Sequence, residues 1–190
     1  MEQIFDYIYK RSDLSDDIKK FIQSISTVKK LKKGDVLIEE NQEVNKTYFV
    51  MDGCLRSYVF DSMGKEYTLQ FALKNDWISD YIAIFNNEKS IQTVECIADS
   101  TVIETSLSEE IENIFLKYPK IESIHRKNLE RNIISLQKRI LNQLQLTSLD
   151  RYRFILKKYP EIEKYAQNYH IASYLGITQQ SLSRIRASFK

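Results

Sequence analysis

The amino-acid sequence predicts an α+β fold, in which a small antiparallel β-roll of the jelly-roll kind is followed by one long helix and a helix-turn-helix unit. Three observations predict it. Short β-branched and aromatic runs occupy residues 27–105 and are separated by turn signals. After residue 107 the helical period returns, and it continues for about 25 residues from Pro119. Two short helical patterns joined by Gly176 then follow near the end of the sequence.

The composition is that of a globular chain large enough for one big domain or two small ones. Of 190 residues, 43% are hydrophobic and 28% charged, and only four are Gly and two Pro, which argues against long disordered linkers. No run approaches the about 18 apolar residues of a membrane span, and the first residues lack the basic and apolar regions of a signal peptide. Cys54 and Cys96 lie in apolar surroundings without metal-ligand spacing. We therefore expect a cytoplasmic protein with reduced thiols, no metal and no cofactor.

Charge is distributed unevenly along the chain. The formal net charge is +2, but residues 147–190 contain eight basic and three acidic side chains, a net charge of +5, which leaves −3 for residues 1–146. A basic unit joined to an acidic one is typical of a sensor domain connected to a nucleic-acid-binding module.

The first two thirds of the chain divide into helical and strand patterns. Residues 1–26 have apolar side chains at helical spacing, in two segments that meet near Leu14 and Ser15. Strands are expected at residues 36–38, 48–51, 55–60, 67–73, 91–97 and 101–105, with a short helix at 81–85. Residues 67–73 alternate in polarity, as a half-buried strand should. We predict a sensor unit over residues 1–107.

A connecting unit is expected over residues 108–146. Ser108 can cap a helix that ends near residue 117, and Pro119 suits the first turn of the next helix. That long helix has an apolar seam with too little of its own domain to cover it, so we favour pairing with a second copy over packing in a groove of the roll. The predicted homodimer contacts are Ile121, Ile124, Leu129, Ile133, Leu136, Ile140 and Leu144.

Residues 147–190 are expected to form a compact helical unit. Ser148 is predicted to cap its first helix, Gly176 to break the second where a positive φ is needed, and Thr178 to cap the third, whose apolar face ends at Phe189. Gln and Arg have the forked donor geometry that contacts adenine and guanine edges in the major groove. The predicted contacts to double-stranded DNA are Thr178, Gln179, Gln180, Ser181, Ser183, Arg184, Arg186 and Lys190.

With this order of units, the chain resembles the cyclic-AMP receptor protein / fumarate-nitrate regulator (Crp/Fnr) family of bacterial transcription factors. Residues 32–38 (KKGDVLI) and 48–53 (YFVMDG) resemble the first turns of the family's cyclic-nucleotide-binding-type β-roll, and residues 61–66 its glycine hairpin. Residues 171–178 (IASYLGIT) resemble the segment before the recognition helix in one branch of the family. The resemblance implies a cytoplasmic homodimer that binds a pseudo-palindromic DNA operator, contacts RNA polymerase and responds to a small-molecule effector.

The sequence departs from the family's nucleotide-binding members where the effector would bind. Their ribose and cyclic phosphate are held by a Gly-Glu segment and an Arg-Ser pair, whereas this chain has Asp80 at the first place and no arginine in residues 89–93. A buried phosphate needs a fixed charged donor, so we do not expect cyclic AMP to bind. The cysteine cluster of oxygen-sensing relatives is missing as well, so no iron–sulfur centre is expected. The candidate effector contacts are Trp77, Asp80, Tyr81, Phe85, Gln92 and Thr93.

Other functions were weighed against this one. A cupin-like metal enzyme would need a His/Glu cluster inside the roll, but the two histidines, His125 and His170, fall on the long helix and in the helix-turn-helix unit. We therefore expect no enzyme activity. Two alternatives stay open: a constitutive DNA-binding dimer with a ligand-free roll, and a protein-interaction module that uses the helix-turn-helix fold.

Overall fold

Two four-stranded antiparallel sheets form the predicted roll, in a computed structural model that describes residues 14–107 and 111–188. The strand order of the first sheet is β1 (Ser26–Leu31), β8 (Ser100–Ser106), β3 (Lys46–Asp52) and β6 (Trp77–Ile78). The order of the second is β2 (Val36–Ile38), β7 (Thr93–Cys96), β4 (Leu55–Phe60) and β5 (Glu66–Ala72). The α+β class is confirmed, and β1 and β6 are additions to the predicted strands.

The two sheets face each other across an apolar core. Tyr48, Val50 and Val102 from the first sheet meet Leu55 and Val94 from the second, and all five side chains are buried. Free Cys54 and Cys96 are buried too, as expected. One turn needs a glycine: Gly53 between β3 and β4 has φ +91°, and a Cβ there would lie 2.5 Å from the carbonyl oxygen of Asp99.

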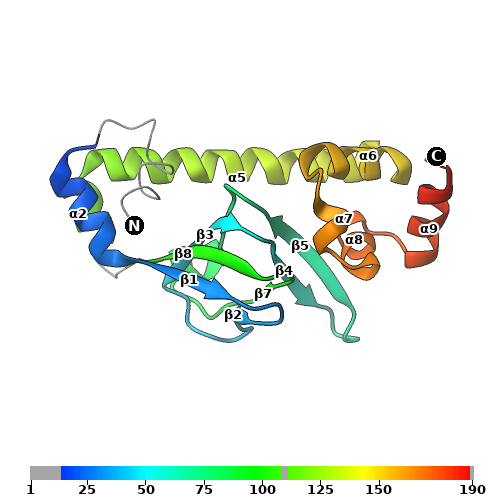
Figure 1. The fold of residues 1–190 in the computed structure, drawn as a ribbon, viewed down its shortest axis with the longest axis horizontal. Helices are drawn as coiled ribbons and strands as arrows, with labels where there is room; N and C mark the ends of the chain where they lie inside the picture. The colour runs from blue at the N-terminus through cyan, green and yellow to red at the C-terminus, as the bar shows by residue number, and fades with distance from the viewer. Residues whose placement is uncertain (1–13, 108–110, 189–190) are drawn as a thin grey trace.

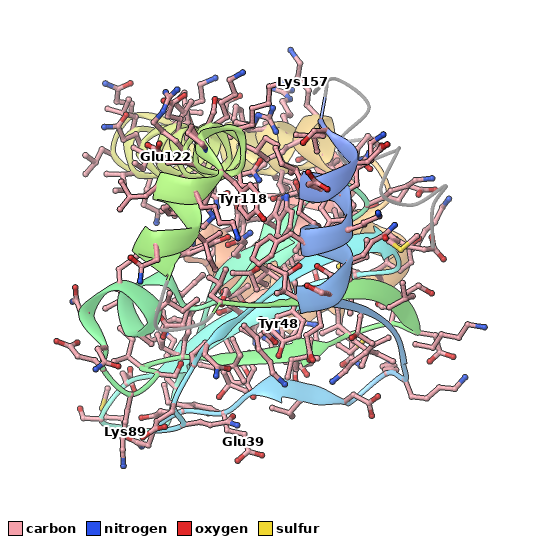
Figure 2. The ribbon with its side chains drawn as sticks, turned by 90° about the vertical axis from the view of Figure 1, so that its left-hand side faces the viewer. Glu39, Tyr48, Lys89, Tyr118, Glu122 and Lys157 are labelled. Carbon is pink, nitrogen blue, oxygen red and sulfur yellow. The ribbon has the colours of Figure 1, made fainter. Side chains whose placement is uncertain are left out.

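The long helix α5 (Pro119–Gln145) runs along one side of the roll, with Pro119 in its first turn as predicted (Figure 1). At one end it meets α2 (Asp16–Ile25) and α4 (Ile111–Lys117). Tyr118 lies between these two helices in Figure 2, and its ring stacks on Phe21 at a centroid distance of 5.1 Å. The short helix α3 (Tyr81–Asn86) confirms the predicted one.

The helix-turn-helix unit lies at the other end of α5 (Figure 1). It comprises α6 (Ser148–Lys158), α7 (Ile162–Tyr165), α8 (Asn168–Leu175) and α9 (Gln179–Ser188). Gly176 has φ 67° and ends α8, as predicted. The predicted cap of α6 at Ser148 is wrong by one residue, because the Thr147 hydroxyl accepts the Asp150 amide at 3.2 Å.

The expectation that β5 is half-buried holds near its start, where Tyr67 is 38% exposed, but fails at its end, where both faces are covered. Ala72 packs inside the roll, whereas Phe71 on the opposite face joins the apolar core of the helix-turn-helix unit. The Phe71 ring packs against Tyr159 and Tyr174, and Tyr159 Oη donates to the Phe71 carbonyl oxygen at 2.9 Å. The roll and the helix-turn-helix unit therefore share a core, which fixes the position of α9.

Some predictions lie outside the described residues. They are the helix over residues 1–12, the cap at Ser108, and the roles of Phe189 and Lys190.

Candidate nucleic-acid interface

One face of α9 is exposed, and its side chains make no hydrogen bond to any other described residue. Gln179, Gln180, Ser183 and Arg184 make up this face, which we call the α9 polar face. At about 100° per residue, these four positions fall within roughly 140° of the helix surface. The α9 helix stands at the end of the molecule farthest from α2 (Figure 1). The α9 polar face is thus open to an approaching partner.

The opposite face of α9 fixes the helix in place. Leu182 is fully buried and Ile185 packs against the same core. At the first turn, the Thr178 hydroxyl accepts the Ser181 amide at 3.1 Å, which confirms the predicted cap. The hydroxyls of Thr178 and Ser181 also lie 3.0 Å apart and hydrogen-bond to each other. Of the predicted DNA contacts, these two have a structural role in the cap.

The structure places Arg186 differently from the prediction, which put it among the DNA contacts. Its Nε lies 2.8 Å from Glu163 Oε1, and its Nη1 donates to Asn168 Oδ1 at 2.5 Å. The guanidinium also stands over the Tyr152 ring, 5.9 Å from the centroid. Arg186 therefore ties α9 to α6, α7 and α8, and its guanidinium is engaged within the helix-turn-helix unit.

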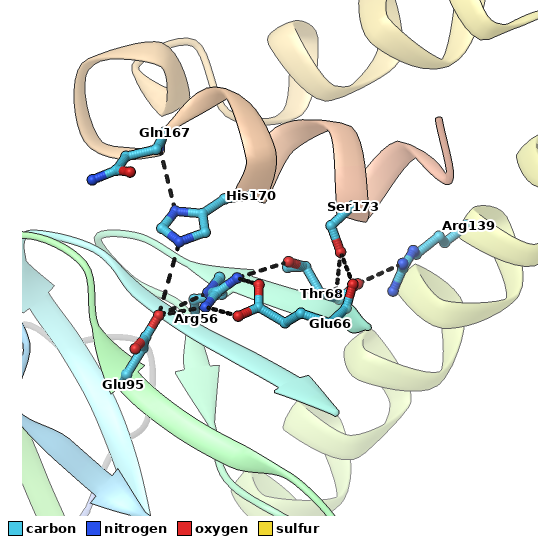
Figure 3. A network of polar contacts seen from close by, with 8 residues as sticks. All are labelled: Arg56, Glu66, Thr68, Glu95, Arg139, Gln167, His170 and Ser173. Atoms are coloured by element: carbon cyan, nitrogen blue, oxygen red, sulfur yellow. Dashed lines mark hydrogen bonds and ion pairs between the residues drawn. The ribbon is translucent and has the colours of Figure 1, made fainter. Parts of the chain in front are cut away.

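Backbone and side-chain hydrogen bonds join α8 to β5, as Figure 3 shows. Ser173 Oγ accepts the Thr68 amide at 2.8 Å and donates to the Glu66 carbonyl oxygen at 2.9 Å. From α5, Arg139 donates to the carbonyl oxygens of Thr68 (2.8 Å), Leu69 and Tyr174 (3.2 Å). Hydrogen bonds thus join α5, β5 and α8 at one place. A displacement of α5 or β5 would therefore disturb the position of α8 in the helix-turn-helix unit.

Arg56 lies at the centre of this contact (Figure 3) and is only 1% exposed. It pairs with Glu66 and, through Nη2 at 2.5 Å, with Glu95. His170 of α8 lies above it, with Nε2 buried, without a hydrogen-bond partner among the described residues, and 4.0 Å from Glu95 Oε1. Burial, reinforced by the nearby Arg56 charge, lowers the pKa of His170 to about 3. The imidazole is therefore neutral at pH 7.

Sequence reasoning missed this cluster of Arg56, Glu66, Glu95, His170 and Ser173. One signal for it was available, since Arg56 follows Leu55 in a strand whose neighbours are mostly apolar. A charged residue in such a strand is seldom buried without an opposite charge, so its position indicates a buried ion pair.

The predicted effector contacts do not converge on one site. Asp80 is fully buried and caps α3, its Oδ1 accepting the amides of Ile82 and Ala83 at 3.0 and 3.1 Å. Its Oδ2 accepts Ser90 Oγ at 2.8 Å and the Ile91 amide at 3.2 Å. Both oxygens of the Asp80 carboxylate therefore accept hydrogen bonds from other residues of the chain. Asp80 has a structural role, which the prediction of an effector contact did not include.

The other five predicted effector contacts separate into two groups. Gln92 donates to the Ser79 carbonyl oxygen at 3.4 Å, and Thr93 pairs with β4. Trp77 and Tyr81 instead line a cavity of about 70 Å³ between the roll and α2, α4 and α5. Phe85 stacks on Tyr81 and is half exposed.

A larger hollow of about 590 Å³ opens between β1, β2 and β3. Its two lysines, Lys29 and Lys46, both pair with Glu104, at 2.8 and 3.2 Å. Because that carboxylate already offsets their charge, the hollow offers no strong site for an anion. Within the described ranges, no three His, Cys, Asp or Glu side chains gather closely enough to hold a metal ion.

The predicted dimer contacts on α5 also separate. Ile121 and Ile124 pack against α2, and Leu129 lines the 70 Å³ cavity, so these three contact their own chain. Farther along, six apolar side chains are 49–77% exposed and form what we call the α5 apolar stripe: Ile133, Ile134, Leu136, Ile140, Leu141 and Leu144. Ile134 and Leu141 were not among the predicted contacts.

Comparison with known proteins agrees with this architecture. Residues 28–118 match the cyclic nucleotide-binding domain family. The predicted resemblance to the Crp/Fnr regulators is confirmed. No described helix has the length and hydropathy of a membrane span.

Individual relatives extend the comparison beyond the cyclic nucleotide-binding domain. The chain is 25% identical over 129 residues to the anaerobic regulatory protein of Bacillus subtilis, a match that covers 64% of this chain and 54% of that protein. FixK2 from Bradyrhizobium japonicum superposes with a TM-score of 0.71 at 18% identity, covering 86% of this chain and 84% of FixK2. A Crp/Fnr-family regulator from Eubacterium rectale gives 0.70 at 20% identity, covering 94% and 85%. The curated relative is thus matched over about half its length, and the solved structures share the fold.

Proposed function

We propose that this protein is a sequence-specific DNA-binding transcriptional regulator of the Crp/Fnr type that acts as a homodimer. The α9 polar face carries the proposal, because its two glutamines and one arginine are exposed, unpaired among the described residues and held on a rigid helix. Such side chains can form bidentate hydrogen bonds with adenine and guanine in the major groove. The relatives support a regulatory role, since they include an anaerobic regulatory protein and a Crp/Fnr-family regulator.

Charge supports the same function. The net charge of +5 over residues 147–190 would attract the phosphate backbone, and the binding would weaken as salt rises. The Arg186 contacts refine the proposed set of base contacts to Gln179, Gln180, Ser183 and Arg184. Gln at the first two positions favours an operator with adenine at the corresponding bases.

The α5 apolar stripe supports the homodimer. A contiguous run of exposed apolar side chains on one helix is stabilised when a second copy covers it. A two-fold dimer presents two α9 helices, which would bind half-sites about 34 Å apart, one turn of DNA. The proposed operator is therefore pseudo-palindromic.

The test uses duplex DNA selected by the full-length protein from a random pool, compared with unselected duplex. Arg184→Ala is expected to weaken binding to selected DNA by about 1–3 kcal/mol and to relax base preference at one position per half-site. Arg131→Ala is the matched control, because Arg131 is an exposed arginine on α5, away from α9. It removes the same charge and should leave base preference unchanged.

Two results would contradict the proposal. One is a failure of the wild-type protein to bind any duplex in a salt-dependent way, which would favour the protein-interaction alternative. The other is an equal loss on selected and unselected DNA for Arg184→Ala, which would remove Arg184 from the base contacts.

A further inference from the structure

A partly enclosed, mainly apolar cavity lies where α5 crosses the roll. It has a volume of about 70 Å³, and its walls come from α2, β3, β6, β8, α3, α4 and α5. Apolar side chains such as Ile22, Trp77, Phe115 and Leu129 make up most of the wall. None of the described residues that line it has a charged side chain. An ion would lose its hydration there without gaining a partner, so the cavity excludes charged ligands.

One polar group in the wall has no partner. His125 Nε2 is buried and makes no hydrogen bond to any described residue, while its ring lies 5.4 Å from Phe115 and 5.9 Å from Phe85. Burial lowers the pKa of His125, which keeps the imidazole neutral. A buried polar atom without a hydrogen bond is uncommon in folded proteins and points to a missing partner.

From these observations we propose that the cavity binds a small uncharged molecule with an apolar body and one hydroxyl group, whose hydroxyl pairs with His125 Nε2. A hydroxyl both donates and accepts, so it matches either tautomer of the neutral imidazole. The volume is about half that of an engineered apolar cavity that holds benzene, which limits the enclosed part to roughly three to five non-hydrogen atoms. A short-chain alcohol has this size and chemistry.

The position of the cavity gives such binding a route to the helix-turn-helix unit. His125 and Leu129 belong to α5, and the same helix carries Arg139, which donates to β5 and to α8. A ligand between α5 and the roll would shift the balance between arrangements of these elements only if it fits one of them better. This regulatory role rests on the proposed DNA-binding function, whereas the binding of the alcohol does not.

The experiment titrates the full-length protein with 1-propanol, propionate and propylammonium, which have similar size but different charge. Trp77 lines the cavity and is the chain's single tryptophan, so its indole N–H gives one NMR signal that reports on the site. We expect 1-propanol to shift this signal saturably, with a dissociation constant no tighter than about 40 µM, the ceiling for a four-atom ligand. Propionate and propylammonium should cause no saturable shift.

Variants separate the cavity from general solvent effects. His125→Leu should weaken 1-propanol binding about three- to tenfold by removing the hydrogen bond while keeping an apolar wall. Ile124→Phe should abolish binding by filling the cavity, and Leu129→Phe provides a second filling variant should the first fail to fold. Leu116→Phe, on the exposed side of α4 and outside the α5 apolar stripe, is the matched control and should bind as wild type does.

A linear shift without saturation in the wild type, an equal response to propionate, or full binding in a folded cavity-filling variant would each overturn the proposal. The measurement needs no DNA. The cavity can therefore fail this test while DNA binding stands, and DNA binding can fail its own test while 1-propanol still binds.

Discussion

Arg184 and Arg186 lie two positions apart on α9 but have different surroundings. Arg184 is exposed on the α9 polar face, whereas Arg186 reaches back to Glu163 and Asn168. At about 100° per residue Arg186 falls within about 20° of Gln179, so its contacts with Glu163 and Asn168, and not the helical period, take it out of the set of base contacts. Residue type alone therefore does not identify a DNA contact, because the same guanidinium can stabilise the unit that presents the contact.

His170 gives a prediction about pH. Its pKa of about 3 in the folded state lies below the 6.5 of the exposed side chain, so the unfolded chain binds the proton first as pH falls. The contribution of His170 to the free energy of unfolding is therefore fully present above pH 6.5 and is lost as the pH falls from 6.5 to about 3. Lowering the pH from about 7.5 to 5.5 should cost about 1.4 kcal/mol through this residue.

Urea unfolding of wild type and His170→Gln at both pH values measures this loss. The variant should lose less stability than the wild type by that amount, because glutamine does not titrate. His125→Gln is the control and should keep the loss due to His170. An identical pH dependence in wild type and His170→Gln would show that the pKa of His170 is the same in the folded and unfolded states, which would contradict the prediction.

At the scale of elements, α5 has different environments along its length. Its first half packs against α2 and the cavity, its roll-facing side donates through Arg139, and its last three turns carry the α5 apolar stripe. The apolar seam predicted over residues 121–144 therefore consists of two surfaces, a first that packs against the rest of the chain and a second, the α5 apolar stripe, that is exposed. The dimer prediction applies to the second of them.

Ile140→Asp combined with Leu144→Asp should convert the homodimer to monomers in sedimentation at micromolar concentration. These side chains are 60% and 77% exposed, so charge there should leave the fold of the single chain intact. Burying two carboxylates at a two-fold interface without partners is costly, which is why the dimer should dissociate. DNA binding should fall with it.

Met63→Asp is the control, because Met63 is 87% exposed at the tip of the β4–β5 hairpin and lies outside the stripe. It should remain dimeric. A wild-type protein that is already monomeric under these conditions would show that the stripe has another purpose.

At the scale of the whole molecule, the roll and the helix-turn-helix unit form one body. Phe71 contributes to the helical core, and the Ser173 hydroxyl of α8 hydrogen-bonds to the Thr68 amide and the Glu66 carbonyl oxygen of β5 (Figure 3). A change in the roll is therefore able to alter the position of α9.

Cyclic AMP is not expected to bind to this body. In residues 79–93 the one basic side chain is Lys89, which is exposed, and the buried Asp80 carboxylate already accepts the Ile82, Ala83 and Ile91 amides. A phosphate beside Asp80 would meet a negative charge and find those donors occupied. Losing one charge-assisted hydrogen bond alone weakens binding about ten- to a hundredfold.

Isothermal titration with cyclic AMP up to millimolar concentration should therefore give no saturable heat. Operator binding measured with and without cyclic AMP should be the same. Saturable micromolar binding that tightens operator binding would mean that a cation from elsewhere, such as the partner subunit, takes the place of the missing arginine.

Most of the local structure was predictable from the sequence. The strand runs at 36–38 and 55–60, the start of α5 at Pro119, the break at Gly176 and the cap at Thr178 agree with the structure. These features depend on backbone dihedral preferences and on side-chain periodicity over a few residues. Preferences that act over a few residues can be identified in a short stretch of the sequence.

Tertiary structure alone decided which polar groups are free and which surfaces are covered. Arg186 pairs with Glu163, which lies 23 positions earlier in the sequence. The end of β5 is covered by contacts with Tyr159 and Ser173, which lie about 90 to 105 positions later. The Asp80 carboxylate accepts hydrogen bonds from Ser90 and Ile91, which the fold brings next to it. A sequence pattern cannot predict such contacts, because they depend on how separate elements pack, and packing is set by the complementarity of the whole core.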